Sequence, residues 1–330
     1  MTERIHGGDW AGFREEFGQA PLDFSASISP LGVPDGVARA AADAVRNADC
    51  YPDPKCRELT AAIAKHENVP ASSILCGAGA ADLIWRTVLA IHPSTAWLQA
   101  PTFGEYRAAL EQANCTVTHD AHEAVDMIIL CNPNNPTGKL TPRETVLQMA
   151  KRGVPMLLDE CFLDFTDDPA ANEVTGVLAD YPNVLVLKAF TKLYAMAGFR
   201  LGYVMCSDTA LLDRVAQAGP PWAVSSVAQA AGLAALQETS YVQQVRTLVK
   251  TERTWLVEEL KMLGLQIVPG SANYILFRAG YSTGESLRQR GILVRTCGDF
   301  EGLDKSWIRI AVRTHEDNET LIRALKEVLA

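Results

Sequence analysis

Short apolar runs, separated by turns rich in glycine, proline and asparagine, recur through much of the chain. Runs of this kind, enriched in valine, isoleucine and leucine, are typical of strands that are buried on both faces. Segments with apolar residues at helical spacing lie between several of them. This alternation predicts an α/β fold, with a mostly parallel sheet covered by helices on both sides. The predicted strands of this sheet are residues 73–76, 95–99, 126–131, 154–159, 184–187 and 201–205.

Helical periodicity marks the elements between and after these strands. It predicts helices over residues 37–48, 57–67 and 208–218, and a longer helical region over residues 226–263. The sequence Thr-Pro-Arg-Glu at residues 141–144 has the pattern of a capping box with proline at the first helical position. We therefore expect another helix to begin there.

The pattern changes after the long helical region, and this change divides the chain. Strands are predicted at residues 265–268, 272–277, 292–295 and 307–312, and helices at residues 283–290 and 315–329. The sequence thus predicts a large doubly wound domain over residues 37–236 and a small α+β domain over residues 237–330. Residues 1–36 are polar and broken by glycine and proline, which indicates an N-terminal arm.

Composition narrows the possible partners. Hydrophobic residues make up 48% of the chain and charged residues 21%, which are ordinary values for a globular protein. The net charge, 30 minus 39 or −9, argues against nucleic acid and anionic membranes as partners. The N-terminus has no apolar signal core, and no segment approaches the ~20 apolar residues of a membrane span. We expect a soluble, cytoplasmic protein.

The metal-binding residue types are scattered. The eight cysteines form no Cys-x2-Cys pair, so reduced core thiols are expected rather than a disulfide framework or a zinc site. His119 and His122 are three residues apart but lack further ligands nearby in the sequence. We predict no metal site.

The segment from Lys188 to Tyr203 carries the strongest chemical signal. Lys192 lies among apolar residues, and desolvation makes a lysine amine easier to deprotonate and therefore a candidate for a Schiff base. Arg200, eight positions later, can bind a phosphate with two parallel hydrogen bonds. The alternative is that both are ordinary solvated surface charges.

The pattern Thr-Lys-x5-Gly-x-Arg-x-Gly-Tyr in this segment resembles the cofactor-lysine segment of the fold-type-I pyridoxal-phosphate enzymes. Within that group it looks most like the threonine-phosphate decarboxylases and the neighbouring histidinol-phosphate aminotransferases. The resemblance implies that Lys192 forms the Schiff base with pyridoxal 5'-phosphate, that Arg200 holds the cofactor phosphate and that Thr191 lies in the cofactor site. Ala189 stands where these enzymes usually have serine or threonine.

Three further segments match the cofactor site of this group. Residues 73–82 read as a strand, a glycine turn and a helix start, a geometry that directs free N–H groups at an anion. By the resemblance, the backbone donors are Gly79, Ala80 and Ala81. Phe103, just after a strand, would stack on the pyridine ring. Asn135, in the turn Asn-Pro-x2-Pro-Thr-Gly, would bond the phenolic oxygen of the cofactor.

Asp159 ends a predicted buried strand, where a carboxylate is unfavourable unless it meets a positive partner. By the resemblance, that partner is the pyridinium nitrogen of the cofactor. The predicted catalytic residues are therefore Asp159 and Lys192. Glu160 is expected to point to the opposite side and to be structural. Phe162 replaces the tyrosine that the aminotransferases usually have, and so favours decarboxylation.

The remaining predicted site residues bind the substrate or the partner subunit. The arm carries the pattern His-Gly-Gly-Asp, which is typical of the decarboxylases, and is expected to fold over the site with His6 and Ser29 at the substrate. Decarboxylases usually have asparagine where Ser27 and Ser29 stand. The resemblance assigns the substrate phosphate to Arg295 and its α-carboxylate to Arg309.

The resemblance also implies a homodimer with shared active sites. Tyr51 would reach the cofactor phosphate of the partner subunit. The expected reaction is decarboxylation of L-threonine O-3-phosphate to (R)-1-amino-2-propanol O-2-phosphate, a step of cobalamin biosynthesis. One alternative is an aminotransferase acting on a phosphorylated amino compound such as histidinol phosphate. The other is a catalytically inactive protein of the same fold that serves binding or regulation.

Overall fold

The computed structural model describes residues 6–330. A seven-stranded sheet forms the centre of the large domain, in the order β2-β8-β7-β6-β5-β3-β4. Neighbouring strands are parallel except at β8, which runs antiparallel to both β2 and β7. The strands are β2 (Ile74–Gly77), β3 (Thr95–Leu98), β4 (Thr116–Thr118), β5 (Met127–Cys131), β6 (Met156–Asp159), β7 (Val184–Ala189) and β8 (Gly202–Met205). The predicted mostly parallel, doubly wound sheet is confirmed.

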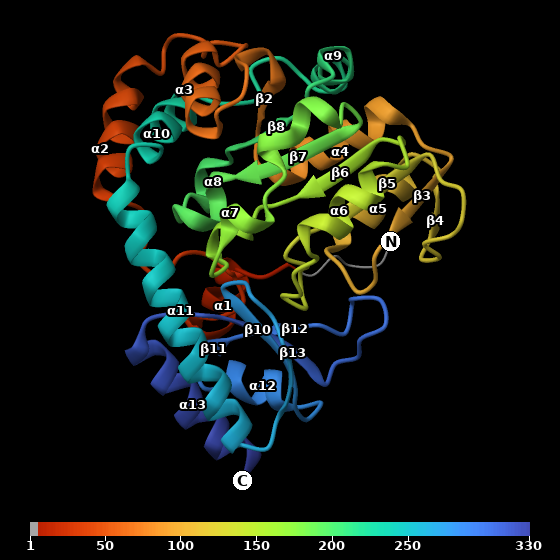
Figure 1. Ribbon diagram of the computed structural model, residues 1–330. Helices are drawn as coiled ribbons and strands as arrows, with labels where there is room; N and C mark the ends of the chain where they lie inside the picture. The colour runs from red at the N-terminus through yellow and green to blue at the C-terminus, as the bar shows by residue number, and fades with distance from the viewer. Residues whose placement is uncertain (1–5) are drawn as a thin grey trace.

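Helices cover both faces of this sheet. In Figure 1, α7 and α8 lie in front of the sheet and α4 lies behind it. The helices of this domain are α2 (Asp35–Ala44), α3 (Arg57–Glu67), α4 (Ala80–Ile91), α5 (Gly104–Gln112), α6 (Arg143–Ala150), α7 (Pro169–Asn172), α8 (Phe190–Leu193), α9 (Thr209–Gln217) and α10 (Ser226–Ala235). Short 3-10 turns are η1 (Val45–Asn47), η2 (Ala71–Ser73), η3 (Leu163–Phe165), η4 (Thr175–Asp180) and η5 (Ala197–Phe199).

The small domain is an antiparallel sheet with helices on one side. Its strands follow the order β12-β13-β10-β9. They are β9 (Gln266–Val268), β10 (Tyr274–Arg278), β12 (Arg295–Thr296) and β13 (Trp307–Ala311), and the helices are α11 (Thr239–Met262), α12 (Thr283–Arg288) and α13 (His315–Leu329). The long helix α11 begins beside the large domain and ends in the small one (Figure 1). It therefore links the two cores.

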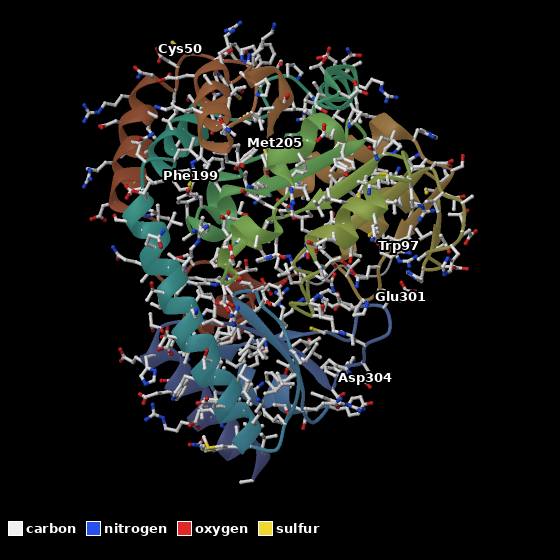
Figure 2. All side chains as sticks on the ribbon, viewed as in Figure 1. Cys50, Trp97, Phe199, Met205, Glu301 and Asp304 are labelled. Carbon is white, nitrogen blue, oxygen red and sulfur yellow. The ribbon has the colours of Figure 1, made fainter. Side chains whose placement is uncertain are left out.

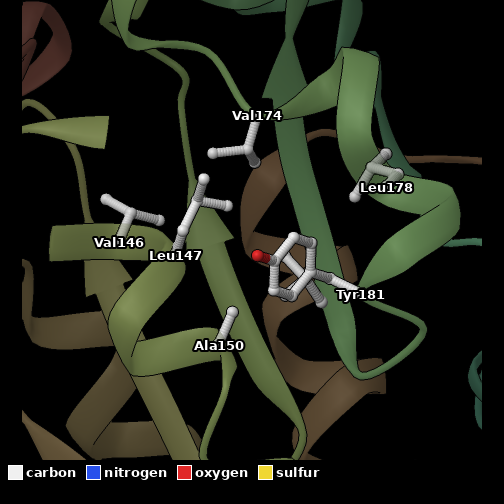
Figure 3. Close-up of a pocket in the computed structure, with 7 residues that line it drawn as sticks. Val146, Leu147, Ala150, Val174, Leu178 and Tyr181 are labelled. Carbon is white, nitrogen blue, oxygen red and sulfur yellow. The ribbon is translucent and has the colours of Figure 1, made fainter. Parts of the chain in front are cut away.

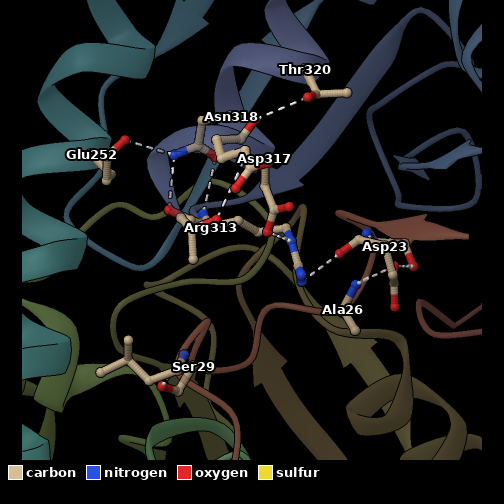
Figure 4. Close-up of polar contacts among 12 residues, drawn as sticks. Asp23, Ala26, Ser29, Glu252, Arg313, Asp317, Asn318 and Thr320 are labelled. Atoms are coloured by element: carbon tan, nitrogen blue, oxygen red, sulfur yellow. Dashed lines mark hydrogen bonds and ion pairs between the residues drawn. The ribbon is translucent and has the colours of Figure 1, made fainter.

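The arm is attached to the small domain. It contains α1 (Trp10–Phe17) and β1 (Leu22–Asp23), and β1 pairs in parallel with β11 (Ile292–Leu293). The fully buried ring of Phe24 belongs to the core of the small domain. Arg313 donates to the Asp23 carbonyl at 3.0 Å and to the Asp317 carboxylate at 2.9 Å, contacts that Figure 4 shows. Arg313 thus ties the arm to α13.

A polar contact also joins the two domains at the opposite end of the small sheet. The Glu301 carboxylate lies 2.9 Å from Nε2 of His119 and accepts a hydrogen bond from Arg107 of α5. Trp97, which Figure 2 labels together with Glu301, donates its indole N–H to the His119 carbonyl at 3.3 Å. His119, considered above only as a metal ligand, pairs with a carboxylate across the domain boundary.

Several predicted boundaries differ from the observed ones. The helix expected over 37–48 is α2 followed by the turn η1, and the helical region 226–263 is broken between α10 and α11. The expected strand 292–295 is two short strands, because β11 pairs with the arm and β12 pairs with β13.

The predicted capping box at residues 141–144 is wrong. Helix α6 begins at Arg143, and Pro142 precedes it with no side-chain cap. The Asn132 side chain holds Thr141 instead, since its Oδ1 accepts from the Thr141 amide at 2.7 Å and its Nδ2 donates to the Thr141 carbonyl at 3.0 Å. This contact from the preceding turn replaces the local cap.

All eight cysteines are free thiols, and only Cys50 is exposed. Across residues 6–330, no helix combines the length and apolar character that crossing a membrane requires.

Candidate active site

The predicted cofactor lysine lies at the carboxyl end of the sheet. Lys192 is in the short helix α8, directly after β7, and its carbonyl accepts a hydrogen bond from the Ser29 amide of the arm at 2.8 Å. Its side chain is half-buried, and its amine lies 5.7 Å from the centre of the Phe162 ring. Burial, together with the positive charges of Arg309 and Arg200, lowers the pKa of this amine to about 8. About a tenth of the amine is therefore neutral, and nucleophilic, at pH 7, a far larger share than for an ordinary lysine.

This pKa has a measurable consequence for cofactor uptake. Because only the neutral amine attacks an aldehyde, we expect the rate of covalent attachment of pyridoxal phosphate to apoenzyme to rise with pH and to level off above about 8. An ordinary lysine would keep gaining reactivity up to about 10.4. Absorbance during uptake at several pH values measures this. A midpoint near that of free lysine would contradict the burial of the amine.

Asp159 ends β6, beside the lysine, and two donors hold its carboxylate. Tyr106 Oη donates to Oδ2 at 2.6 Å, and the Cys161 amide donates to Oδ1 at 2.9 Å. The side chain is 5% exposed. Burial raises the pKa of the Tyr106 hydroxyl well above its usual value, as does the nearby carboxylate, so Tyr106 keeps its proton and remains a donor. The carboxylate is thus fixed in one orientation.

Tyr106 is a site residue that the sequence did not reveal. We expect Tyr106→Phe to lower kcat about tenfold to a hundredfold, because a hydrogen bond to a charged group contributes roughly 1.5 to 3 kcal/mol. The substitution should affect thermal stability less than it affects kcat, since the ring and its packing are retained. Steady-state kinetics of the two proteins measure the effect. An unchanged kcat would show that the Asp159 orientation does not depend on this bond.

The Arg200 guanidinium lies against the turn where β2 meets α4. Gly79 has φ +87°, and a Cβ atom there would lie 2.8 Å from Nη2 of Arg200. The guanidinium is held beside this turn, with Nη1 donating to the Ala197 carbonyl at 3.1 Å. The Gly79 amide donates to the Gly77 carbonyl at 2.8 Å, whereas Ala80 and Ala81 open helix α4, where amides have no preceding turn to bond. An arginine and a helix N-terminus converge at this point.

Phe103 stands on the other side of the site, at the start of α5. Its half-buried ring meets Tyr106 edge-on, with centres 5.6 Å apart and an angle of 86°. His6 of the arm lies close by, with its ring centre 5.9 Å from Phe103 and its Nε2 3.1 Å from Glu105. The structure therefore places His6 of the arm beside Phe103.

Arg309 reaches the same region from the small domain. Its Nη1 donates to Oδ1 of Asn135, and its Nη2 donates to the Ser25 carbonyl at 2.7 Å. The guanidinium is buried, yet its Nε has no hydrogen-bond partner among residues 6–330. With its oxygen bound by Arg309, the Asn135 side chain presents its NH₂ group as the free donor.

Arg295 is directly opposite Arg309 in the register of β12 and β13. It is also buried, and it pairs with Asp299 at 2.6 Å, with its guanidinium 4.9 Å from the centre of the Phe300 ring. Ser29 is buried in the arm, where its Oγ lies 2.7 Å from the Tyr241 hydroxyl. The pairing of Arg295 with Asp299 was not foreseen.

Tyr51 is the predicted residue that this chain does not bring to the site. It is 83% exposed and packs on Trp222, with ring centres 5.0 Å apart. Thr191, in contrast, is buried next to Lys192 in α8.

A family model described as aminotransferase class I and II matches residues 20–325. The chain belongs to this family. Threonine-phosphate decarboxylase from Salmonella typhimurium is 36% identical, with 100% of this chain and 98% of the relative covered. Histidinol-phosphate aminotransferase from Symbiobacterium thermophilum is 33% identical, with 91% and 88% covered. The crystal structure of histidinol-phosphate aminotransferase from Clostridium acetobutylicum is 28% identical, with a TM-score of 0.85 and coverage of 92% and 98%.

Enzymes of this family use pyridoxal phosphate, and the residues present fit that group. Lys192 would supply the amine for the aldehyde, and Asp159 would supply the carboxylate for the ring nitrogen. The missing Cβ of Gly79 lets the Arg200 guanidinium lie against this turn, where it could bind a phosphate. The donor set therefore matches an aromatic aldehyde that also carries a phosphate.

Figure 3 shows a separate hollow between α6 and the 3-10 turn η4. Its lining is Val146, Leu147, Ala150, Val174, Leu178, Tyr181 and Val184. With one phenol among hydrocarbon side chains, it offers no catalytic group. No cluster of three or more potential metal-binding side chains occurs in the described part of the chain.

Proposed function

We propose that this enzyme decarboxylates L-threonine O-3-phosphate to (R)-1-amino-2-propanol O-2-phosphate for cobalamin biosynthesis. The observation that carries the proposal is the cross-strand pair of Arg295 and Arg309, two buried guanidinium groups on the small-domain side of Lys192. Such a pair suits a substrate with two anionic groups, one a carboxylate and one a phosphate. The full-length similarity to the Salmonella decarboxylase supports the same reaction.

Substrate binding is assigned to the small domain and the arm. Arg309 would take the α-carboxylate with its unpartnered Nε and a neighbouring NH₂ group. Arg295 would bind the phosphate, which would either share the guanidinium with Asp299 or displace the Asp299 carboxylate. His6 and Ser29, which belong to the arm, would cover the substrate.

Bound pyridoxal phosphate supplies an electron sink for the bond between the α-carbon and the carboxylate. Asp159, fixed by Tyr106, would keep the proton on the ring nitrogen. Lys192 would donate a proton to the substrate α-carbon after CO₂ departs, and its lowered pKa suits that transfer near neutral pH. Phe162 presents an apolar ring to this amine and limits water around it.

The second candidate is an aminotransferase acting on a phosphorylated amino compound such as histidinol phosphate. The similarity to enzymes with that name, in sequence and in structure, favours it. Phe162 argues against it, because aminotransferases of this group usually have tyrosine there, and the phenylalanine ring cannot donate to the cofactor oxygen.

One incubation separates the two candidates. Holoenzyme is mixed with L-threonine O-3-phosphate, and CO₂ and product amine are measured with and without 2-oxoglutarate. We expect one CO₂ per substrate with no need for the oxo acid, whereas transfer of the amino group to 2-oxoglutarate would overturn the proposal. O-phosphoserine is assayed in parallel, since one methyl group contributes only ~1 to 3 kcal/mol to discrimination.

The role of Arg295 can be tested with a substitution. We expect Arg295→Gln to raise KM for threonine phosphate about tenfold to a hundredfold, because a hydrogen bond to a charged group contributes roughly 1.5 to 3 kcal/mol. Activity with unphosphorylated L-threonine should change much less. Arg278→Gln, at an exposed arginine of the same sheet, is the matched control. Equal losses with both substrates would show that Arg295 does not bind the substrate phosphate.

We also propose that the enzyme is a homodimer, with twice the 35.8 kDa mass of one chain in solution. The exposed pair of Tyr51 and Trp222 supports this arrangement, because two large aromatic side chains on the surface favour a protein contact. Tyr51 would then reach the cofactor phosphate of the partner subunit.

A further inference from the structure

A second cavity lies beside the active site. It has a volume of about 500 Å³ and is bounded by the end of α3, the segment from β6 to α7, the segment from β7 to α8, and the start of α11. Glu160 lines it, and Glu160 follows Asp159 in the chain. Since successive residues of an extended segment point to opposite sides, the two carboxyl groups serve different spaces. We call this space the acidic cavity.

The lining of the acidic cavity carries an excess of negative groups. Five carboxylic acids and two cationic side chains line it, which gives a formal charge of two minus five, or −3, when all are ionised. Both cations are already paired, since Lys188 lies 2.9 Å from Glu67 and Arg246 lies 2.8 Å from Asp164. The five acids are Glu67, Glu160, Asp164, Asp168 and Glu173. The charge that a ligand would neutralise is therefore negative.

Glu160 is the group in this lining that most needs a partner. It is 1% exposed, and neither of its carboxyl oxygens makes a hydrogen bond within residues 6–330. Burial raises its pKa to about 8, although the charge of Lys188 opposes that shift. A buried carboxyl group without hydrogen bonds is unfavourable, because it has lost its contacts with water and gains none from the protein. A cationic ligand would stabilise its charged form.

Aromatic rings complete the lining. Phe190, Tyr194 and Tyr203 all border the cavity. The Phe190 ring centre lies 5.7 Å from that of Tyr194 and 5.8 Å from that of Tyr203, so the three rings form one connected group. Aromatic faces attract organic cations, and quaternary ammonium ions are bound by such rings together with carboxylates.

We propose that the acidic cavity binds a small organic ammonium ion, with the cation placed between Glu160 and the three aromatic rings. The volume falls within the range of small-molecule sites, which is roughly 300 to 1,000 Å³. A metal ion is a poorer match, because the described residues contain no cluster of three or more metal-binding side chains. This inference does not depend on the reaction proposed above.

Choline is a suitable probe, because its quaternary nitrogen cannot form a Schiff base with the cofactor. Isothermal titration calorimetry of the holoenzyme should show saturable choline binding, one molecule per chain. The neutral analogue, in which a tert-butyl group replaces the trimethylammonium group, should bind at least about tenfold more weakly. An absence of saturable binding by choline, or equal binding of the two compounds, would overturn the proposal.

Substitutions locate the binding. We expect Glu160→Gln to weaken choline binding at least about tenfold, and Glu173→Gln, at the more exposed part of the lining, to weaken it less. Glu258→Gln, an exposed residue of α11, removes the same charge away from the cavity and should bind like the wild type. If Glu160→Gln does not fold, the Glu173→Gln result decides. Wild-type affinity in the folded cavity variants would contradict the assignment.

Discussion

Replacing Lys192 with alanine is expected to abolish covalent attachment of the cofactor and to lower kcat by at least about a thousandfold, since proton transfer by a positioned group alone contributes 10² to 10⁴. The bond from the Ser29 amide to the Lys192 carbonyl holds the backbone of α8 and does not involve the lysine side chain. Steady-state kinetics and the visible spectrum of the purified variant measure both effects.

Lys151→Ala, at an exposed lysine just after α6, is the control and should retain full activity and a bound cofactor. The variant protein should still fold, because alanine fits helix α8. A Lys192→Ala enzyme with near-normal turnover would instead support the reading of this chain as a binding or regulatory protein of the same fold.

Asp159→Asn is expected to give the second large effect, a fall in kcat of about 10² to 10⁴. The substitution keeps the shape of the side chain but removes the negative charge beside the ring nitrogen, so that nitrogen loses the partner that keeps it protonated. Tyr106 and the Cys161 amide, which now donate to a carboxylate, would meet a neutral amide. Single-turnover measurements with threonine phosphate isolate the chemical step.

Asp126→Asn is a matched control for this prediction. Asp126 also accepts two backbone N–H groups, from Ser94 and Thr95, but it lies just before β5 at the opposite end of the sheet. It should change stability more than kcat. Asp159→Glu, which keeps the charge on a longer side chain, should recover part of the lost rate. Equal kinetics for Asp159→Asn and the wild type would show that Asp159 has no catalytic role.

The large domain could be predicted because its strands are encoded locally. Residues 127–131 and 184–187 are continuous apolar runs, and each forms a strand with buried side chains on both faces. The lysine segment was also recognisable, since burial of an amine among apolar residues can be read from neighbouring positions. Its lowered pKa follows first from that burial.

The features that sequence reasoning missed depend on contacts between distant residues. Tyr106 and Asp159 are 53 positions apart and meet only after α5 packs beside β6. The arm strand β1 pairs with β11, which lies far along the chain. This pairing could not be predicted, because the polar pattern of residues 1–36 contains no signal for the partner strand. Asp299 is only four residues from Arg295, yet their pairing depends on the turn that follows β12.

The covalent bond between Lys192 and the cofactor is the central claim, and peptide mapping tests it most directly. Holoenzyme is reduced with borohydride, digested and analysed by mass spectrometry. The account predicts one pyridoxyl-modified peptide, and that peptide contains Lys192. A modification at another lysine, or an unmodified chain after loading with pyridoxal phosphate, would contradict it.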